Sequence, residues 1–304
     1  MARIIILFLR IFSFVFFLQP RKVQLFWGNS LGSLLFFLKF RAKVIRQNLE
    51  IAFPGELQRQ EKYFRASYQS LGNLILEILM LFGSMRRFVL SRVDFIGKEH
   101  ADQVLKEGKG FFFLSSHLGN WEVMAAAGGL IGKFDLMLVT KRLKPEWLHQ
   151  AITQWRLECQ VKATYEPKTV KDILTHLKKN GAVGFVLDQF AGAPIGVRVP
   201  LFGVPVGTPL ALATLVKRTG TPVLPVQNYR KSDGRWAVVI SPPKPWIEHP
   251  DSHYELALNT AEYVSVLESH IRENPEQWLW THRRFKGDLS PLKENEWSIP
   301  RVRK

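Results

Sequence analysis

Short apolar segments that alternate with helical segments constrain the fold of this chain more than any other feature of its sequence. Runs of the kind found in buried strands cover residues 111–114, 136–140, 182–187, 222–227 and 236–240. Helical segments separate most of them, and such crossovers connect parallel strands. The sequence therefore predicts an α/β fold, with a mostly parallel sheet flanked by helices. Turn residues 231–234 predict a hairpin, and hence one antiparallel pair, at an edge of the sheet.

Periodicity and end signals predict the helices. They cover residues 56–82, 99–107, 145–158, 169–179, 209–218 and 253–272, and a further helix begins at Trp121. Thr208 is expected to cap the helix that starts at residue 209. The predicted buried face of the helix over 56–82 consists of Tyr63, Tyr68, Leu71, Ile75, Ile78 and Leu79. No repeat or low-complexity linker divides residues 41–304, so we expect them to form a single α/β domain.

The first 40 residues are strongly apolar. Residues 4–18 contain Arg10 as their one charged residue, and as a helix they would extend about 22 Å, short of the roughly 30 Å of a bilayer core. Residues 19–22 offer no small-residue cleavage site, which argues against a signal peptide. A second apolar stretch, 23–40, precedes Arg41, Lys43 and Arg46, which suit anionic headgroups. We expect residues 1–40 to be an N-terminal membrane anchor of interfacial helices; the alternative is two ordinary core helices.

The formal net charge of +16 requires a polyanionic partner: nucleic acid, anionic lipid or an acidic protein. The basic residues show no nucleic-acid reading motif or stacking array, so we do not expect nucleic acid to be the partner. The single cysteine, Cys159, excludes an intramolecular disulfide and any metal site built from several cysteines, and it is expected to lie in the core. We expect neither a metal nor a cofactor.

A histidine and a glutamate five residues apart mark the candidate active site. Within one regular helix, His117 and Glu122 would point about 140° apart. If His117 lies in the loop after the strand over 111–114 and Glu122 in the first helical turn, the carboxylate can fold back onto the imidazole. It would then fix the tautomer and strengthen the ring as a general base. Asn120 is expected to cap the helix, whose free N–H groups suit an oxyanion, and to contribute to substrate binding.

Two further pairs of residues follow predicted strands. Asp188 and Gln189 end the strand over 182–187, at the edge where His117 should lie, and suit either the site or a structural turn. Lys141 and Arg142 follow the strand over 136–140, and either bind a phosphate group or are solvated surface charges.

Five blocks of sequence carry a resemblance to a known family. They are HLGNWE at 117–122, VIRQNLEIAFPGE at 44–56, VLDQFAG at 186–192, the stretch 199–226, and PEQWLWTHRRFK at 275–286. Together they resemble the bacterial lipid A late acyltransferases, the lauroyl and myristoyl transferases, over nearly the whole chain. The resemblance implies a fold like that of the glycerol-phosphate acyltransferases. It also implies that Arg283 lies in a functional block, where phosphate binding and structural pairing are both open.

The activity implied by this resemblance is secondary acylation in lipopolysaccharide biosynthesis. A fatty acyl group would pass from an acyl carrier protein thioester to a hydroxyl of a lipid A precursor, at the cytoplasmic face of the bacterial inner membrane. His117 would act as the base and Glu122 would orient it. Apolar side chains, including Phe190 and Phe202, would either line an acyl channel or simply belong to the core.

Other activities remain open at this point. The related glycerol-phosphate acyltransferases carry an E-G-T-R block where this chain reads LDQFAG, which argues against a simple lysophosphatidate acceptor. Acylation of another membrane glycolipid or lysophospholipid is an alternative, because the phosphatidylinositol mannoside acyltransferases have similar motifs. A membrane-bound binding protein without activity is the other alternative. The sequence does not distinguish an acyl carrier protein donor from a coenzyme A donor.

Overall fold

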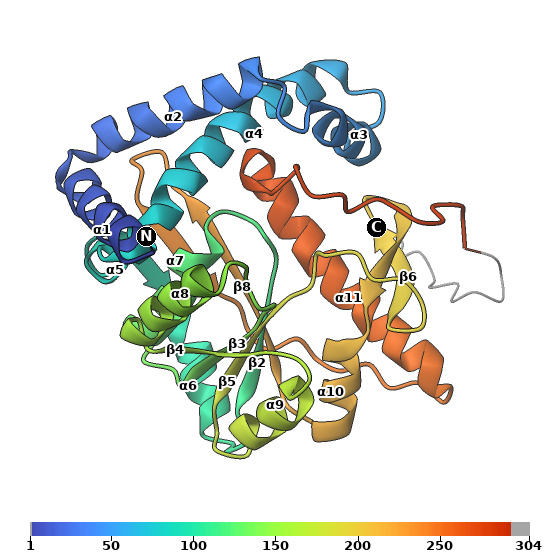
Figure 1. Cartoon of the computed structure of the whole chain (residues 1–304). Helices are drawn as coiled ribbons and strands as arrows, with labels where there is room; N and C mark the ends of the chain where they lie inside the picture. Colours follow the sequence, from blue (N-terminus) through green and yellow to red (C-terminus); the bar gives the residue numbers. More distant parts are fainter. Residues whose placement is uncertain (1, 293–304) are drawn as a thin grey trace.

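The structure, a computed structural model, describes residues 2–292 of the chain and has a seven-stranded sheet at its centre (Figure 1). The strand order is β1-β9-β8-β2-β5-β3-β4, and a separate antiparallel pair is formed by β6 and β7. The strands are β1 Val93–Ile96, β2 Phe111–Ser115, β3 Leu136–Val139, β4 Val161–Thr164, β5 Ala182–Val186, β6 Gly196–Leu201, β7 Val204–Pro209, β8 Val223–Arg230 and β9 Trp236–Ile240.

Helices cover both faces of the sheet, and the first helices of the chain form a further layer beside it (Figure 1). They are α1 Ala2–Leu18, α2 Arg21–Phe37, α3 Ala42–Ala52, α4 Leu57–Ile78, α5 Met85–Arg92, α6 Lys98–Leu105, α7 Trp121–Leu130, α8 Glu146–Glu158, α9 Thr169–Leu177, α10 Ala211–Thr219 and α11 Ser252–Glu273, with 3₁₀ turns at Leu79–Phe82 and Pro275–Gln277.

The predicted α/β class is confirmed, because β8, β2, β5, β3 and β4 run parallel. The predicted hairpin is also confirmed, since β8 and β9 pair antiparallel. This pair is not at the edge, because β1 adds to β9 as a parallel outer strand. The predicted strands did not include β1, β4, β6 or β7. Of these, β1 and β4 are only four residues long and have few of the continuous apolar residues that mark central strands.

Alternation along β2 explains why its whole sequence is apolar. Phe111 and Phe113 pack into one core cluster with residues of α5–α8, while Phe112 and Leu114 pack into another with residues of α9–α11. Successive side chains of a strand point to opposite faces, so a strand covered on both faces must be apolar throughout. This buried strand places the loop that follows it at the carboxyl end of the sheet.

The N-terminal helices lie on the body of the protein. Helix α2 crosses α4 at close range: a Cβ at Gly28 would lie 2.1 Å from Asn73, and one at Gly32 would lie 2.4 Å from the carbonyl oxygen of Tyr68. Among residues 2–292, no helix is both long and apolar enough to cross a membrane. The N-terminal helices nevertheless carry exposed large apolar side chains, including Phe8 at 67%.

One local prediction is wrong, and another is right only in part. Thr208 does not cap a helix, because it pairs with Val197 across the β6–β7 ladder, and α10 begins only at Ala211. The predicted buried face of α4 is right in part. Tyr68 is buried, and Tyr63, Ile78 and Leu79 pack partly buried against the core, but Ile75 is exposed. The buried residues of α4 are Phe64, Ser67, Tyr68, Gly72, Asn73, Leu74 and Glu77.

Candidate active site

The loop between β2 and α7 presents His117 at the carboxyl end of the sheet. Asn120 caps α7 as predicted: its Oδ1 accepts hydrogen bonds from the backbone N–H groups of Glu122 at 3.1 Å and Val123 at 3.2 Å. The side chain of Asn120 has no exposed surface. The contacts seen for Asn120 are structural, and its contribution to substrate binding stays a prediction. Because the N–H groups of Glu122 and Val123 are bonded to Asn120, these two groups are not free to bind an oxyanion as predicted.

Asn228 of β8 holds the backbone of this loop. Its Oδ1 accepts a hydrogen bond from the N–H of Asn120 at 3.0 Å, and its Nδ2 donates to the carbonyl of Asn120 at 2.8 Å. Gly119 lies against the same side chain with φ of +63°, and a Cβ there would lie 2.1 Å from Oδ1 of Asn228. Both the backbone conformation and the close contact require glycine at this position.

A C-terminal segment closes the other side of the loop. The N–H of Gly119 donates to the carbonyl of Gln277 at 3.0 Å, and the N–H of Leu279 donates to the carbonyl of His117 at 3.1 Å. Between these bonds, Trp278 directs its indole N–H toward the site. The block PEQWLWTHRRFK thus supports the loop, a role that its sequence did not indicate.

The carboxylate that pairs with His117 belongs to Asp188, which follows β5. Nδ1 of His117 and Oδ1 of Asp188 lie 2.7 Å apart. Oδ2 of Asp188 accepts two further hydrogen bonds, from the N–H of His117 at 2.8 Å and from the indole of Trp278 at 2.7 Å. Because Nδ1 faces the carboxylate, Nε2 is the ring nitrogen that remains for a substrate. The predicted position of Asp188 beside His117 is confirmed.

The prediction that Glu122 folds back onto the imidazole is wrong. Its carboxylate forms an ion pair with Arg156 of α8, in which Nε of Arg156 lies 3.1 Å from Oε2 of Glu122. The side chains are 7% and 11% exposed, respectively. The first turn of α7 directs Glu122 toward α8, whereas the neighbouring strand β5 brings Asp188 directly to His117. A contribution of Glu122 to catalysis through its charge stays a prediction.

The electrostatics of the His117–Asp188 pair suit a general base. Burial lowers the pKa of His117, but the charge and hydrogen bond of Asp188, helped by the charge of Glu122, raise the pKa above its usual 6.5. Burial raises the pKa of Asp188, but the charge and hydrogen bonds of His117 and the hydrogen bond from Trp278 outweigh burial and lower it. Asp188 therefore stays ionised and stabilises the protonated ring.

Breaking the Glu122–Arg156 pair is expected to destabilise the fold. Glu122→Ala would leave the guanidinium of Arg156 buried without its carboxylate, which costs roughly 3 kcal/mol in the free energy of unfolding. Urea unfolding followed by circular dichroism measures this loss. Glu146→Ala is the matched control, because its pair with Arg142 is on the surface, and we expect no resolvable change there. Equal midpoints for both variants would contradict a structural role for the Glu122–Arg156 pair.

Polar and aromatic side chains surround the free side of the imidazole. Nε2 of Gln189 lies 3.5 Å from Nε2 of His117, so the predicted proximity of Gln189 is confirmed. The ring of Trp121 meets the imidazole edge-on at 4.8 Å, and the ring of His282 lies parallel to it at 6.4 Å. Burial is the main cause that lowers the pKa of His282, which favours a neutral ring beside His117.

The remaining predicted binding residues are on the surface, and their role in binding stays a prediction. Lys141 and Arg142 are exposed, and Arg142 pairs with Glu146 on the same surface. Arg283 is also exposed, whereas its neighbour Arg284 is buried and bonded to Thr208 at 2.6 Å. Arg284 also donates to the carbonyl of Gln189 at 3.3 Å, so this buried arginine supports the backbone beside the site.

An apolar cavity of about 60 Å³ lies between α7 and the sheet, next to the site. Its lining includes Phe113, Trp121, Met124, Leu138, Phe185 and Val238. Neither phenylalanine named in the sequence analysis lines it. Phe202 is buried among the aromatic rings of another core cluster, and Phe190 lines a separate cavity of about 360 Å³. Trp121 lines this cavity and also contacts the ring of His117, so one side chain lies between the cavity and the imidazole.

Comparisons of the chain with known proteins found a family model and several similar proteins. A family model described as "Bacterial lipid A biosynthesis acyltransferase" matches residues 1–287. The chain is 30% identical to the lipid A biosynthesis lauroyltransferase of Escherichia coli (strain K12) over 274 residues, 85% of this chain and 84% of the relative. It is 28% identical to the palmitoleoyltransferase of the same strain, over 88% of this chain and 86% of the relative. A phosphatidylinositol mannoside acyltransferase of Mycolicibacterium smegmatis is 24% identical over 66% of this chain and 64% of the relative.

Proposed function

Because this chain belongs to the bacterial lipid A biosynthesis acyltransferase family, we propose that it transfers a fatty acyl group from an acyl carrier protein thioester to a hydroxyl of a lipid A precursor. The observation that carries the proposal is the His117–Asp188 pair, placed where the loops of the sheet converge. That the chain is an acyltransferase follows from its family, which sets aside the alternative of a binding protein without activity.

In the proposed mechanism, His117 acts through Nε2. It accepts the proton of the acceptor hydroxyl as that oxygen attacks the thioester carbonyl. Asp188 holds the ring in the required tautomer and stabilises the imidazolium that forms. Collapse of the tetrahedral intermediate breaks the carbon–sulfur bond, and the departing thiolate takes the proton from His117. The products are an ester and a free carrier thiol.

Direct transfer without an acyl-enzyme is supported by the state of Cys159. This side chain is 3% exposed, and burial raises the pKa of its thiol to about 11. A thiol in that condition is a poor nucleophile near neutral pH. The thioester donor is already activated, so the mechanism needs no covalent intermediate.

The net charge supports the proposed partners. A charge of +16 suits both an acidic carrier protein and a phosphorylated lipid. The apolar cavity beside Trp121 provides a surface suited to part of an acyl chain. Acylation of a different membrane glycolipid is the second candidate, favoured by the similarity to the mycobacterial phosphatidylinositol mannoside enzyme.

We propose that α1 and α2 hold the enzyme at the cytoplasmic face of the inner membrane as interfacial helices. Support comes from large apolar side chains that point to solvent, among them Phe8 of α1, Trp27 of α2 and Phe37 at the end of α2. Lys39 and Arg41 follow directly and are exposed, which places positive charge beside this apolar surface. This combination is typical of helices that lie in the headgroup region.

Mass spectrometry of lipid A tests the proposed acceptor. A strain that lacks this chain is expected to accumulate lipid A one secondary acyl chain lighter, and expression of the chain from a plasmid is expected to restore the missing acyl group. An unchanged lipid A pattern would count against a lipid A acceptor. Loss of an acyl group from another glycolipid in the same extract would instead identify the second candidate.

A further inference from the structure

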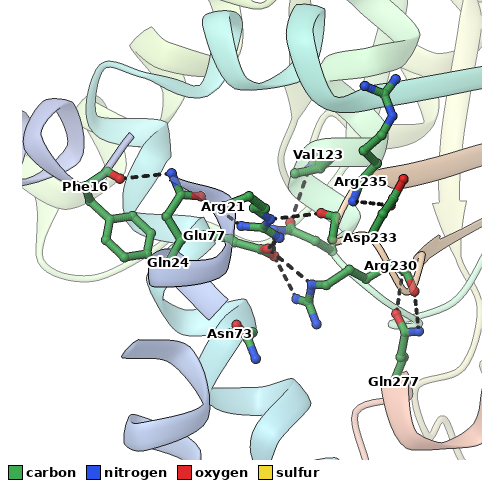
Figure 2. Close-up of polar contacts among 12 residues, drawn as sticks. Phe16, Arg21, Gln24, Asn73, Glu77, Val123, Arg230, Asp233, Arg235 and Gln277 are labelled. Atoms are coloured by element: carbon green, nitrogen blue, oxygen red, sulfur yellow. Dashed lines mark hydrogen bonds and ion pairs between the residues drawn. The ribbon is translucent and has the colours of Figure 1, made fainter. Parts of the chain in front are cut away.

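A carboxylate that the proposed mechanism does not use lies beneath the catalytic loop. It belongs to Glu77, near the end of α4, and its side chain is only 1% exposed. Figure 2 shows it between two guanidinium groups, those of Arg21 at the start of α2 and Arg230 at the end of β8. Arg230 donates from Nη2 at 2.9 Å and from Nε at 3.3 Å, so it engages both carboxylate oxygens.

The three charges form one buried unit. Burial raises the pKa of Glu77, but the charges of Arg230 and Arg21 outweigh burial and lower it, so Glu77 is ionised. A carboxylate enclosed in this way is stable only while its cationic partners stay in place. Arg21 also donates to the carbonyl of Gly234 at 2.9 Å and to Gln24 at 3.0 Å. The start of α2 is thereby joined to the turn between β8 and β9.

The first connection from this unit to the catalytic loop runs through Asn120. Its Nδ2 faces Oε2 of Glu77 at 3.4 Å, while its Oδ1 holds the first turn of α7. The amide oxygen is therefore directed at the start of the helix, while the amide nitrogen is directed at Glu77. A shift of Glu77 would move the residue that ends the His117 loop.

The second connection runs through Arg230 and Gln277 (Figure 2). The side chain of Gln277 accepts from the N–H of Arg230 at 2.7 Å and donates to its carbonyl at 3.0 Å. The carbonyl of Gln277 in turn accepts the N–H of Gly119, two residues after His117. The next residue, Trp278, donates to Asp188. Both members of the catalytic pair thus depend on a segment that is attached to Arg230.

We propose that Glu77 is a positioning residue for acyl transfer: by fixing Arg230 and Asn120, it holds the His117 loop in register with Asp188. The inference rests on the proposed role of His117 as the base. Through Arg21, the same carboxylate fixes the start of α2, so the N-terminal helices and the catalytic loop share one anchor. The simpler reading is that Glu77 stabilises the fold and nothing more, and an experiment separates the two.

The test uses Glu77→Gln in the full-length chain, assayed for acyl transfer with acyl carrier protein thioester and lipid A precursor over a range of pH. We expect kcat to fall about 10–100-fold with KM within about twofold, because binding surfaces remain while the base is misplaced. The acid limb of kcat should also move to lower pH. The titratable groups that act on the ring are Asp188, which is bonded to it, Glu122 through its charge, and His282. Of these interactions, the pair with Asp188 is the one that we expect to loosen.

Asn120→Ser is the second variant, because serine keeps the cap oxygen but loses the Nδ2 donor to Glu77. We expect it to lower kcat less than Glu77→Gln does. The double variant should be no worse than Glu77→Gln alone, since both changes cut the same connection. If Glu77→Gln does not fold, Asn120→Ser decides, because it retains all three buried charges. Wild-type kcat and an unmoved acid limb in Asn120→Ser would then overturn the proposal.

Glu61→Gln is the matched control on the same helix. Glu61 pairs with Arg46 and Arg65 on the surface, and we expect its removal to leave kcat and the acid limb unchanged. A folded Glu77→Gln variant with the wild-type acid limb, reduced only in its active fraction, would show a purely structural role. His117→Ala in the same assay distinguishes failure of the proposed mechanism from failure of the proposed role of Glu77. If His117→Ala retains activity, the proposed function fails, whatever the result for Glu77→Gln.

Discussion

Replacing His117 with alanine is expected to lower kcat for acyl transfer by about 10²–10⁴-fold, the usual contribution of a general base. Asp188 binds Nδ1 of the imidazole, so Nε2, which has only the amide of Gln189 nearby at 3.5 Å, is the ring nitrogen that can accept the proton of a substrate. Without the imidazole, the acceptor hydroxyl must lose its proton to water, while the binding surfaces for donor and acceptor stay in place. We therefore expect KM to change little. Single-turnover transfer of a radiolabelled acyl group in washed membranes measures the effect.

His249→Ala provides the control for this substitution. His249 is exposed and packs against Tyr254, far along the chain from the catalytic loop. It should retain wild-type kcat and the same association with membranes. A fully active His117→Ala variant would exclude the proposed mechanism.

Replacing Asp188 with asparagine is expected to lower kcat by about 10²–10⁴-fold and to change its pH dependence, as loss of the orienting carboxylate does in Ser-His-Asp enzymes. In the wild type, the pKa of His117 is raised above 6.5, so activity should fall as the pH drops through that raised value and the base becomes protonated. In Asp188→Asn, burial still lowers the pKa of the ring, but its main opposing charge is gone. The acid limb should therefore move to lower pH.

The shift of the acid limb is measured by comparing kcat of the wild type and of Asp188→Asn over a range of pH. Asp94→Asn is the control, because Asp94 is a surface carboxylate whose pKa is lowered to about 2 by hydrogen bonds from Arg235 and Lys231. Asp94 forms ion pairs with Arg235 and Lys231, as Asp188 does with His117, but it lies on β1, at the outer edge of the sheet. An Asp188→Asn variant that keeps the acid limb of the wild type would show that Asp188 does not set the pKa of the base.

The parts of the site that the sequence predicted correctly follow from local rules. His117 ends up in a loop because β2 is apolar on both faces and Asn120 caps the next helix, and both signals are contained in a few adjacent residues. Asp188 and Gln189 were placed beside His117 because β2 and β5 were expected to be parallel strands of one sheet, whose carboxyl ends meet at one edge.

The parts that the sequence analysis missed depend on side chains that come from distant segments. The five-residue spacing predicts a pair of Glu122 with His117. The helix instead directs the carboxylate of Glu122 to Arg156, 34 residues further along the chain. Trp278 reaches Asp188 across 90 residues, and Arg230 reaches Glu77 across 153. A buried charge takes whichever partner the fold brings near it, and neither periodicity nor spacing encodes that partner.

By itself, the sequence determined the α/β class, the strand-to-helix loop that carries His117 and the family to which the chain belongs. These depend on apolar patterning, on helix-capping chemistry and on blocks of adjacent residues, all of which act over short distances. Only the tertiary structure decided that Asp188 rather than Glu122 holds the imidazole and that Glu77 lies beneath the loop. The reason is physical: the strength of an ion pair or hydrogen bond depends on separation in space and on burial, and both are properties of the folded chain.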